Sequence, residues 1–180
     1  TAGVLVFGVL PGVICAVLLS VVWLLSVMSR PNDAVLGHVA SVAGYHDLKD
    51  FPQAETIPGL LIYRFEADLV FFNCDYFRSR LLRHIAAAPT PVEWVLIDAS
   101  PINVVDYTAV RKIDALRQEL AARGISLAYV RAKQSLKRFF NSDWVSERVT
   151  ADNGLLFPTV TSGVEAFARR ADRVTGLGDD

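Results

Sequence analysis

The sequence predicts a small α/β domain, in which helices pack on a mixed β-sheet, preceded by one transmembrane helix. Three observations carry this prediction. Residues 1–29 contain no Asp, Glu, Lys, Arg or His, and every charged residue lies at Arg30 or beyond. Short β-rich runs then alternate with segments of helical periodicity. Within them, one strand–helix–strand run has the spacing of a parallel crossover unit, which places helices on the face of a sheet.

The uncharged segment 1–29 is interpreted as a membrane helix. Its apolar run from Val4 to Met28, at about 1.5 Å per residue, is long enough to span roughly 30 Å of bilayer hydrocarbon. A signal peptide, the alternative, would have a basic start, a shorter apolar core and a small-residue cleavage site. Because the chain starts at the edge of this run without an initiator methionine, we expect a piece of a longer protein.

Pro11 and Gly12 interrupt the apolar run and bear on the surroundings of this helix. A proline inside a membrane helix frees a backbone carbonyl, which neighbouring helices usually help to satisfy. This favours a helix that belongs to a bundle, and the alternative is a kinked single-span anchor. The single flanking Arg30 favours a cytoplasmic location for the rest of the chain. The whole protein is expected to be a multi-pass protein of the cell (inner) membrane.

The polar segment 30–33 is expected to link the membrane helix to a domain at 34–172, which a polar tail at 173–180 follows. The first strand is predicted at Ala34–Val39, and a loop at Ala40–Pro58. Two further β-rich runs, Gly59–Phe65 and Leu69–Phe72, are predicted to pair across a tight turn.

A helix is predicted next, capped by Asn73 and running to about Ala88. Its helical spacing leaves Arg78, Arg80, Arg83 and His84 for solvent. The remaining predicted elements are a strand at Val92–Ile97, a helix at Asp106–Arg123 stopped by Gly124, a strand at Ser126–Val130, a short helix at Gln134–Ser142, a short strand near Asn153–Leu156, and a last helix at Thr161–Arg170 with a Ser162–Glu165 capping box.

Charge and cysteine content exclude several function classes. The formal net charge is −1 without a long run of one sign, so no nucleic-acid partner is expected. Cys15 lies in the apolar run and Cys74 in the domain, and both are interpreted as reduced packing residues. Neither a metal site nor a bound cofactor is expected, and no P-loop or Gly-x-Gly-x-x-Gly pattern occurs in the chain.

The segment from Leu96 to Ala109 holds the candidate site. It places Asp98, Ser100, Asn103, Asp106 and Thr108 between the carboxyl end of an inner strand and the start of a helix, where α/β sheets usually bind ligands. Local capping and turn formation are the alternative roles of the two carboxylates. A hydrolase would need a base beside the hydroxyl of Ser100 or Thr108, and the sequence offers none, so no enzyme is predicted.

The soluble part resembles a STAS domain, the module shared by anti-sigma factor antagonists and the tails of sulfate permease (SulP) transporters. Several short motifs match the transporter form in order and position: Arg30-Pro31, Ala34-Val35-Leu36-Gly37, Tyr45 and Pro52, Pro58 to Phe65, Phe71-Phe72-Asn73, Phe77-Arg78, Asp98-Ala99-Ser100, Asp106-Tyr107-Thr108, Arg123-Gly124-Ile125 and Phe157-Pro158-Thr159-Val160. The resemblance covers nearly the whole chain.

This resemblance implies the regulatory and assembly tail of a secondary anion transporter, joined to the rest of its membrane domain and forming a homodimer. It also implies contact with a regulatory protein or a nucleotide. In the antagonists, a hydroxyl at the position of Thr108 is phosphorylated by a partner kinase, although Tyr107 and Ala109 depart from the usual motif. The alternatives are a single-span, membrane-anchored STAS signalling protein under such a kinase and, ranked last, a small α/β enzyme.

Overall fold

The computed structural model describes residues 8–133 and 156–175 of the chain, with side chains up to Arg170. The chain divides into two compact units, Thr1–Pro31 and Asn32–Asp180. The predicted helix at Gln134–Ser142 lies outside the described residues, as do residues 1–7 of the expected membrane span.

Helix α2, Val9–Ser29, makes up the described part of the first unit. Its mean hydropathy of 2.5 and its length suffice to cross a membrane. The hydroxyls of Ser20, Ser26 and Ser29 donate to carbonyl oxygens four residues earlier at 2.8, 2.8 and 2.6 Å. The hydroxyl groups of these three serines therefore need no acceptor outside the helix.

Pro11 lies in the first turn of α2, because the helix begins at Val9. In a first turn the backbone N–H groups have no intrahelical partner, so a proline there removes no hydrogen bond. The expectation that Pro11 frees a carbonyl within the helix is therefore wrong, and it does not argue for a bundle.

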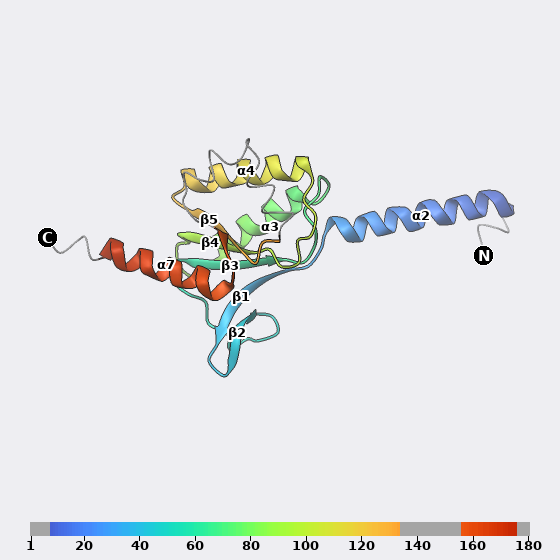
Figure 1. Ribbon diagram of the computed structural model, residues 1–180. Helices are drawn as coiled ribbons and strands as arrows, with labels where there is room; N and C mark the ends of the chain where they lie inside the picture. The colour runs from blue at the N-terminus through green and yellow to red at the C-terminus, as the bar shows by residue number, and fades with distance from the viewer. Residues whose placement is uncertain (1–7, 134–155, 176–180) are drawn as a thin grey trace. The chain divides into compact units, whose positions relative to one another are not determined.

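The second unit contains a mixed sheet, and this confirms the predicted fold class (Figure 1). Its strands are β1 Asp33–Val39, β2 Val42–Asp47, β3 Leu60–Phe65, β4 Trp94–Asp98, β5 Ser126–Val130 and β6 Leu156–Phe157. Among the described residues they form one six-stranded sheet in the order β2-β1-β3-β4-β5-β6. The pairs β2–β1 and β1–β3 are antiparallel, and the pairs from β3 to β6 are parallel.

Helices cover both faces of this sheet (Figure 1). Helices α3, Cys74–Ala87, and α4, Tyr107–Ala122, pack on one face and helix α7, Val160–Thr175, packs on the other. Alternate residues of a strand point to opposite faces, so Leu96 faces α7 and Ile97 faces α3 and α4. The central strands β4 and β5 are therefore apolar except for Asp98 at the end of β4 and Ser126 at the start of β5, as expected for parallel strands buried on both sides.

Two strand predictions are wrong. The expected loop contains β2, Val42–Asp47, which follows β1 after a two-residue turn. The first three residues of β2 are all exposed. The segment therefore lacks the alternation of apolar and polar residues that marks a half-buried strand. The run at Leu69 does not pair with β3; Leu69 instead makes an isolated parallel bridge with Val105.

Helix ends were predicted with mixed success. The carboxylate of Asp106 caps α4 and accepts from the N–H of Ala109 at 2.7 Å, and Gly124 follows that helix with a φ of 77°. Asn73 precedes α3, but its side chain does not cap it and instead accepts from Val70 N–H at 3.0 Å. At the start of α7, the hydroxyl of Thr159 accepts from the N–H of Ser162 at 3.1 Å.

The Thr159 contact replaces the expected Ser162–Glu165 capping box, because α7 begins at Val160, one residue earlier than predicted. The proposed divisions at 1–29, 30–33, 34–172 and 173–180 stay predictions.

Candidate functional site

Asp98 ends β4 and is fully buried, with an exposed fraction of 0%. Arg64, at the adjacent position of β3, donates from Nε to its Oδ2 at 2.7 Å. Arg131, directly after β5, donates from Nε to Oδ1 at 2.9 Å and also bonds Oδ2 through a terminal nitrogen. The Ser100 N–H donates to Oδ1 at 3.1 Å. One carboxylate thus joins the carboxyl ends of three parallel strands.

These contacts decide the charge of Asp98. Burial acts to raise the pKa of this carboxyl, but the hydrogen bonds from Arg131, Arg64 and Ser100 outweigh it and hold the pKa below its usual value. Because both oxygens already accept two hydrogen bonds each, the carboxylate is unsuited to act as a general base. The predicted contact of Asp98 with a partner or nucleotide stays a prediction.

A second carboxylate ties the loop after β4 to the loop before α3. Asp68 accepts from the N–H groups of Asn103 and Val104 at 2.6 and 2.9 Å. Asp106 also links these two parts of the chain. Its Oδ2 accepts from Phe71 N–H at 2.7 Å, while its Oδ1 caps α4. Capping and turn formation, the alternative role considered for Asp106, is therefore what the structure shows for this residue.

Thr108 is exposed at the second residue of α4, beside the exposed Tyr107. Ser100 is half-buried, and Asn103 is exposed and accepts from Lys133 Nζ. The predicted residues thus lie along one loop and the helix start that follows it. Within the described residues, no group of three or more His, Cys, Asp or Glu side chains could hold a metal ion.

Arg64 and Arg131 were missed by the sequence analysis. Both stand at the carboxyl end of a strand next to the one that ends in Asp98, so strand alignment could have paired them with it. Arg131 also has a positive φ of 55°, a backbone conformation that residues other than Gly seldom adopt. Its backbone N–H donates to Phe157 O at 3.1 Å, and its guanidinium donates to the Asp98 carboxylate.

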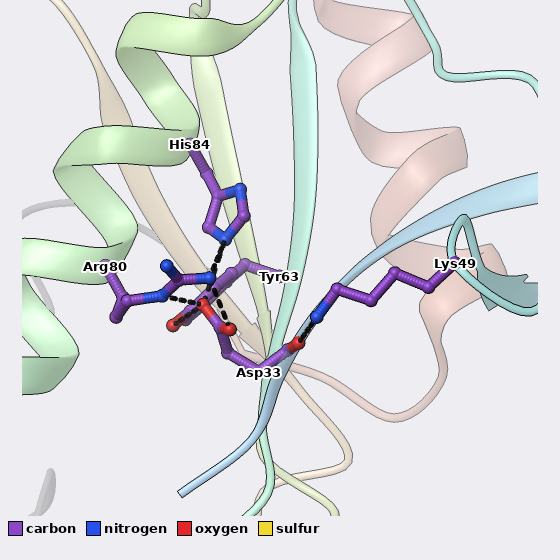
Figure 2. A network of polar contacts seen from close by, with 5 residues as sticks. All are labelled: Asp33, Lys49, Tyr63, Arg80 and His84. Atoms are coloured by element: carbon purple, nitrogen blue, oxygen red, sulfur yellow. Dashed lines mark hydrogen bonds and ion pairs between the residues drawn. The ribbon is translucent and has the colours of Figure 1, made fainter. Parts of the chain in front are cut away.

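The structure contains a second polar cluster, around Asp33 at the start of β1 (Figure 2). Arg80 donates to both carboxylate oxygens of Asp33, at 2.8 and 2.7 Å. His84 Nε2 and Tyr63 Oη lie 2.9 and 3.0 Å from Oδ2. Lys49 Nζ donates to the backbone oxygen of Asp33 at 2.8 Å. Arg80 and His84 were predicted to face solvent, and this is wrong because both turn toward a buried carboxylate.

The Asp33 carboxylate is 5% exposed and ionised. Burial acts to raise its pKa, but hydrogen bonds from Arg80, His84 and Tyr63 lower the pKa to about 2. Burial beside the same carboxylate raises the pKa of the Tyr63 hydroxyl far above its ordinary value. This cluster ties Asp33, the first residue of β1, to helix α3.

Comparison with known proteins agrees with this architecture. Residues 51–173 match the model of the STAS domain family. A probable sulfate transporter of Mycobacterium tuberculosis (strain ATCC 25618 / H37Rv) is 42% identical over 170 residues, covering 94% of this chain and 30% of the relative. Sulfate transporter 1.2 of Arabidopsis thaliana is 27% identical over 172 residues, covering 91% of this chain and 26% of the relative. The chain thus spans less than a third of the length of these relatives.

Solved structures share the fold. The murine anion transporter Slc26a9 superimposes with a TM-score of 0.77 at 20% identity, over 88% of this chain and 25% of that one. The STAS domain of a SulP transporter from Vibrio cholerae superimposes with a TM-score of 0.52 at 13% identity, over 70% of this chain and 94% of that one. A mixed sheet between helices, matched in this way, is a STAS fold. The chain belongs to the STAS domain family.

Proposed function

We propose that this chain is the C-terminal part of a membrane anion transporter of the sulfate permease type. In this proposal α2 is the last transmembrane helix, and the STAS domain is a cytoplasmic module at the inner membrane that regulates and assembles the transporter. It catalyses no reaction. The two relatives compared above are named as a probable sulfate transporter and a sulfate transporter.

The observation that carries the proposal is the extent of the match to the mycobacterial relative. An alignment covering 94% of the chain must include both most of α2 and the STAS domain. An apolar helix followed by this domain is therefore shared with a probable sulfate transporter as one continuous unit. A STAS domain matched alone would support a soluble antagonist equally well.

Transport itself belongs to the part of the protein outside this chain. The partners of the domain are then the remaining membrane helices and a second copy of the same protein. Sulfate is the first substrate to examine, because the relatives carry that name, and bicarbonate and dicarboxylates follow as further oxyanions.

The test is anion uptake by proteoliposomes that hold the protein encoded by the complete gene, compared with a version that ends after Pro31. We expect the intact protein to take up at least one of these anions, and the shortened one to be altered in rate or assembly. An intact protein that moves none of them would contradict the proposal. Equal uptake and equal assembly of the two forms would contradict the role of the domain.

A second function, favoured by the exposure of Thr108 at the start of α4, is control by a partner kinase. A phosphate there would lie at a helix N-terminus, which stabilises negative charge, but next to Asp106, which repels it. Thr108→Glu adds a charge and Thr108→Val removes the hydroxyl at similar size. A change of uptake in the first variant and wild-type uptake in the second support this control, and equal uptake in both variants contradicts it.

A further inference from the structure

A cavity of about 180 Å³ adjoins the Asp33 cluster. It lies between the C-terminal turn of α3, the loop that follows β2, and the strands β1 and β3. Apolar side chains form most of its wall, including Val35, Leu48, Ile57, Leu61 and Val92. Apolar protein cavities of about 150 Å³ bind molecules such as benzene. This one is large enough for a six-membered ring with one small substituent.

Among the described residues that line this cavity, His84 is the one titratable side chain, and it also belongs to the Asp33 cluster (Figure 2). An ionised carboxylate cannot donate a hydrogen bond, so in the 2.9 Å contact Nε2 of His84 must carry the proton. A terminal nitrogen of Arg80 lies 3.4 Å from Nε2, but it too is only a donor, so this longer contact does not change the assignment.

The tautomer of His84 defines what the cavity offers to a ligand. A neutral imidazole that is protonated on Nε2 presents the lone pair of Nδ1 as an acceptor. No described residue forms a hydrogen bond with Nδ1. The hydroxyls of Thr56 and Thr90 also belong to the wall, and that of Thr90 accepts from the N–H of Gly59 at 3.1 Å. The cavity thus combines an apolar body with a few polar groups, of which Nδ1 of His84 can only accept.

We propose that this cavity binds small hydroxylated apolar molecules, of the phenol or short-chain alcohol type, whose hydroxyl donates to Nδ1 of His84. The ring or alkyl group fills the apolar space, and the imidazole connects the ligand to Asp33 at the start of β1. This inference does not depend on the transport proposed above, because it concerns only the described residues of the domain.

The experiment compares phenol with toluene, which has nearly the same shape but no hydroxyl. The full chain is placed in lipid nanodiscs at pH 8, with labelled Val, Leu and Ile methyl groups. We expect saturable shifts of the Val35, Leu61 and Val92 methyl signals. Phenol should bind about two- to tenfold more tightly than toluene, which is the range for one hydrogen bond. Affinities are calculated from the free aqueous concentration of each compound, because toluene partitions into lipid more than phenol does.

Two variants test the roles of the two ring nitrogens of His84 one at a time. In His84→Gln the amide nitrogen takes the place of Nε2 and can still donate to Asp33, whereas the acceptor at Nδ1 is lost. In His84→Asn the amide oxygen can take the place of Nδ1, and the contact with Asp33 is lost. We expect the preference for phenol to disappear in His84→Gln and to persist in His84→Asn.

Three results would overturn the proposal. The first is equal affinity of the wild-type chain for phenol and toluene, which needs no variant. The second is saturable binding whose shifts lie away from the cavity, or no binding of either compound. The third is a preference for phenol that survives in a folded His84→Gln protein.

Discussion

Replacing Asp33 by Asn tests the cluster that ties β1 to α3. The difference between the usual pKa of 3.8 and the value of about 2 in the fold, at about 1.4 kcal/mol per pKa unit, corresponds to roughly 2–3 kcal/mol. Loss of one partner of a buried pair costs about 3–5 kcal/mol. Because Arg80 keeps 20% side-chain exposure and Asn can still accept one hydrogen bond, we expect a loss of about 2–3 kcal/mol at pH 7.

The assay is urea denaturation of the full chain in nanodiscs, followed by circular dichroism. Asp75→Asn is the matched control, since Asp75 pairs with Lys112 at 2.6 Å but has 80% side-chain exposure. An exposed pair of this kind contributes less than about 1 kcal/mol. If Asp33→Asn loses no more stability than Asp75→Asn, the reasoning about the buried carboxylate is refuted.

The same carboxyl predicts a pH dependence. Its pKa is lower in the folded than in the unfolded chain, so its contribution is fully present above about pH 4 and is lost as the pH falls toward 2. At pH 3 about 1 kcal/mol of the contribution should be gone. The difference in stability between wild type and Asp33→Asn must therefore shrink between pH 5 and pH 3; a constant difference would contradict the linkage.

Three further substitutions have expected outcomes in the same denaturation assay. Asp98→Asn should cost about 3 kcal/mol, because Arg64 and Arg131 then lose their shared buried anion; a loss below about 1 kcal/mol would show that the pairs are not needed. Gly163→Ala should destabilise the fold by about 1 kcal/mol although Ala favours helices, since the new Cβ would meet Leu96 at 2.8 Å; increased stability would contradict that contact. Gly124→Ala should cost about 1 kcal/mol for the positive φ alone, because nothing lies within 4 Å of the added Cβ, and an unchanged midpoint would argue against that backbone conformation.

Local sequence signals account for the parts of the fold that were predicted. The uncharged run, the apolar strands β3, β4 and β5, and the helices α3 and α4 with Asp106 and Gly124 at the ends of α4 all depend on neighbouring residues. The antiparallel edge of the sheet was harder to predict from sequence. The first residues of β2 are exposed and show no alternation, and this segment forms a strand because it pairs with β1. Hydropathy cannot report such pairing.

The polar clusters show where a sequence stops being informative. Asp98 and Thr108 could be selected as site residues from their place between a strand and a helix, since that arrangement is encoded over a few residues. The partners of the Asp33 carboxylate are separated from it by 30 to 51 positions, and no local period relates them. Arg80 and His84 fall on the polar side of an isolated helix, where solvent is the simplest expectation.

The sequence by itself determined the apolar helix, the central strands β3, β4 and β5 with the helices between them, and the STAS resemblance, because each follows from residue type and short-range spacing. Only the tertiary structure decided that Asp33 and Asp98 are buried anions held by arginines, and that His84 joins one of them to an apolar cavity. The physical reason is that a charged side chain is stable inside a protein only when distant parts of the chain bring it a partner, and the fold alone sets those distances.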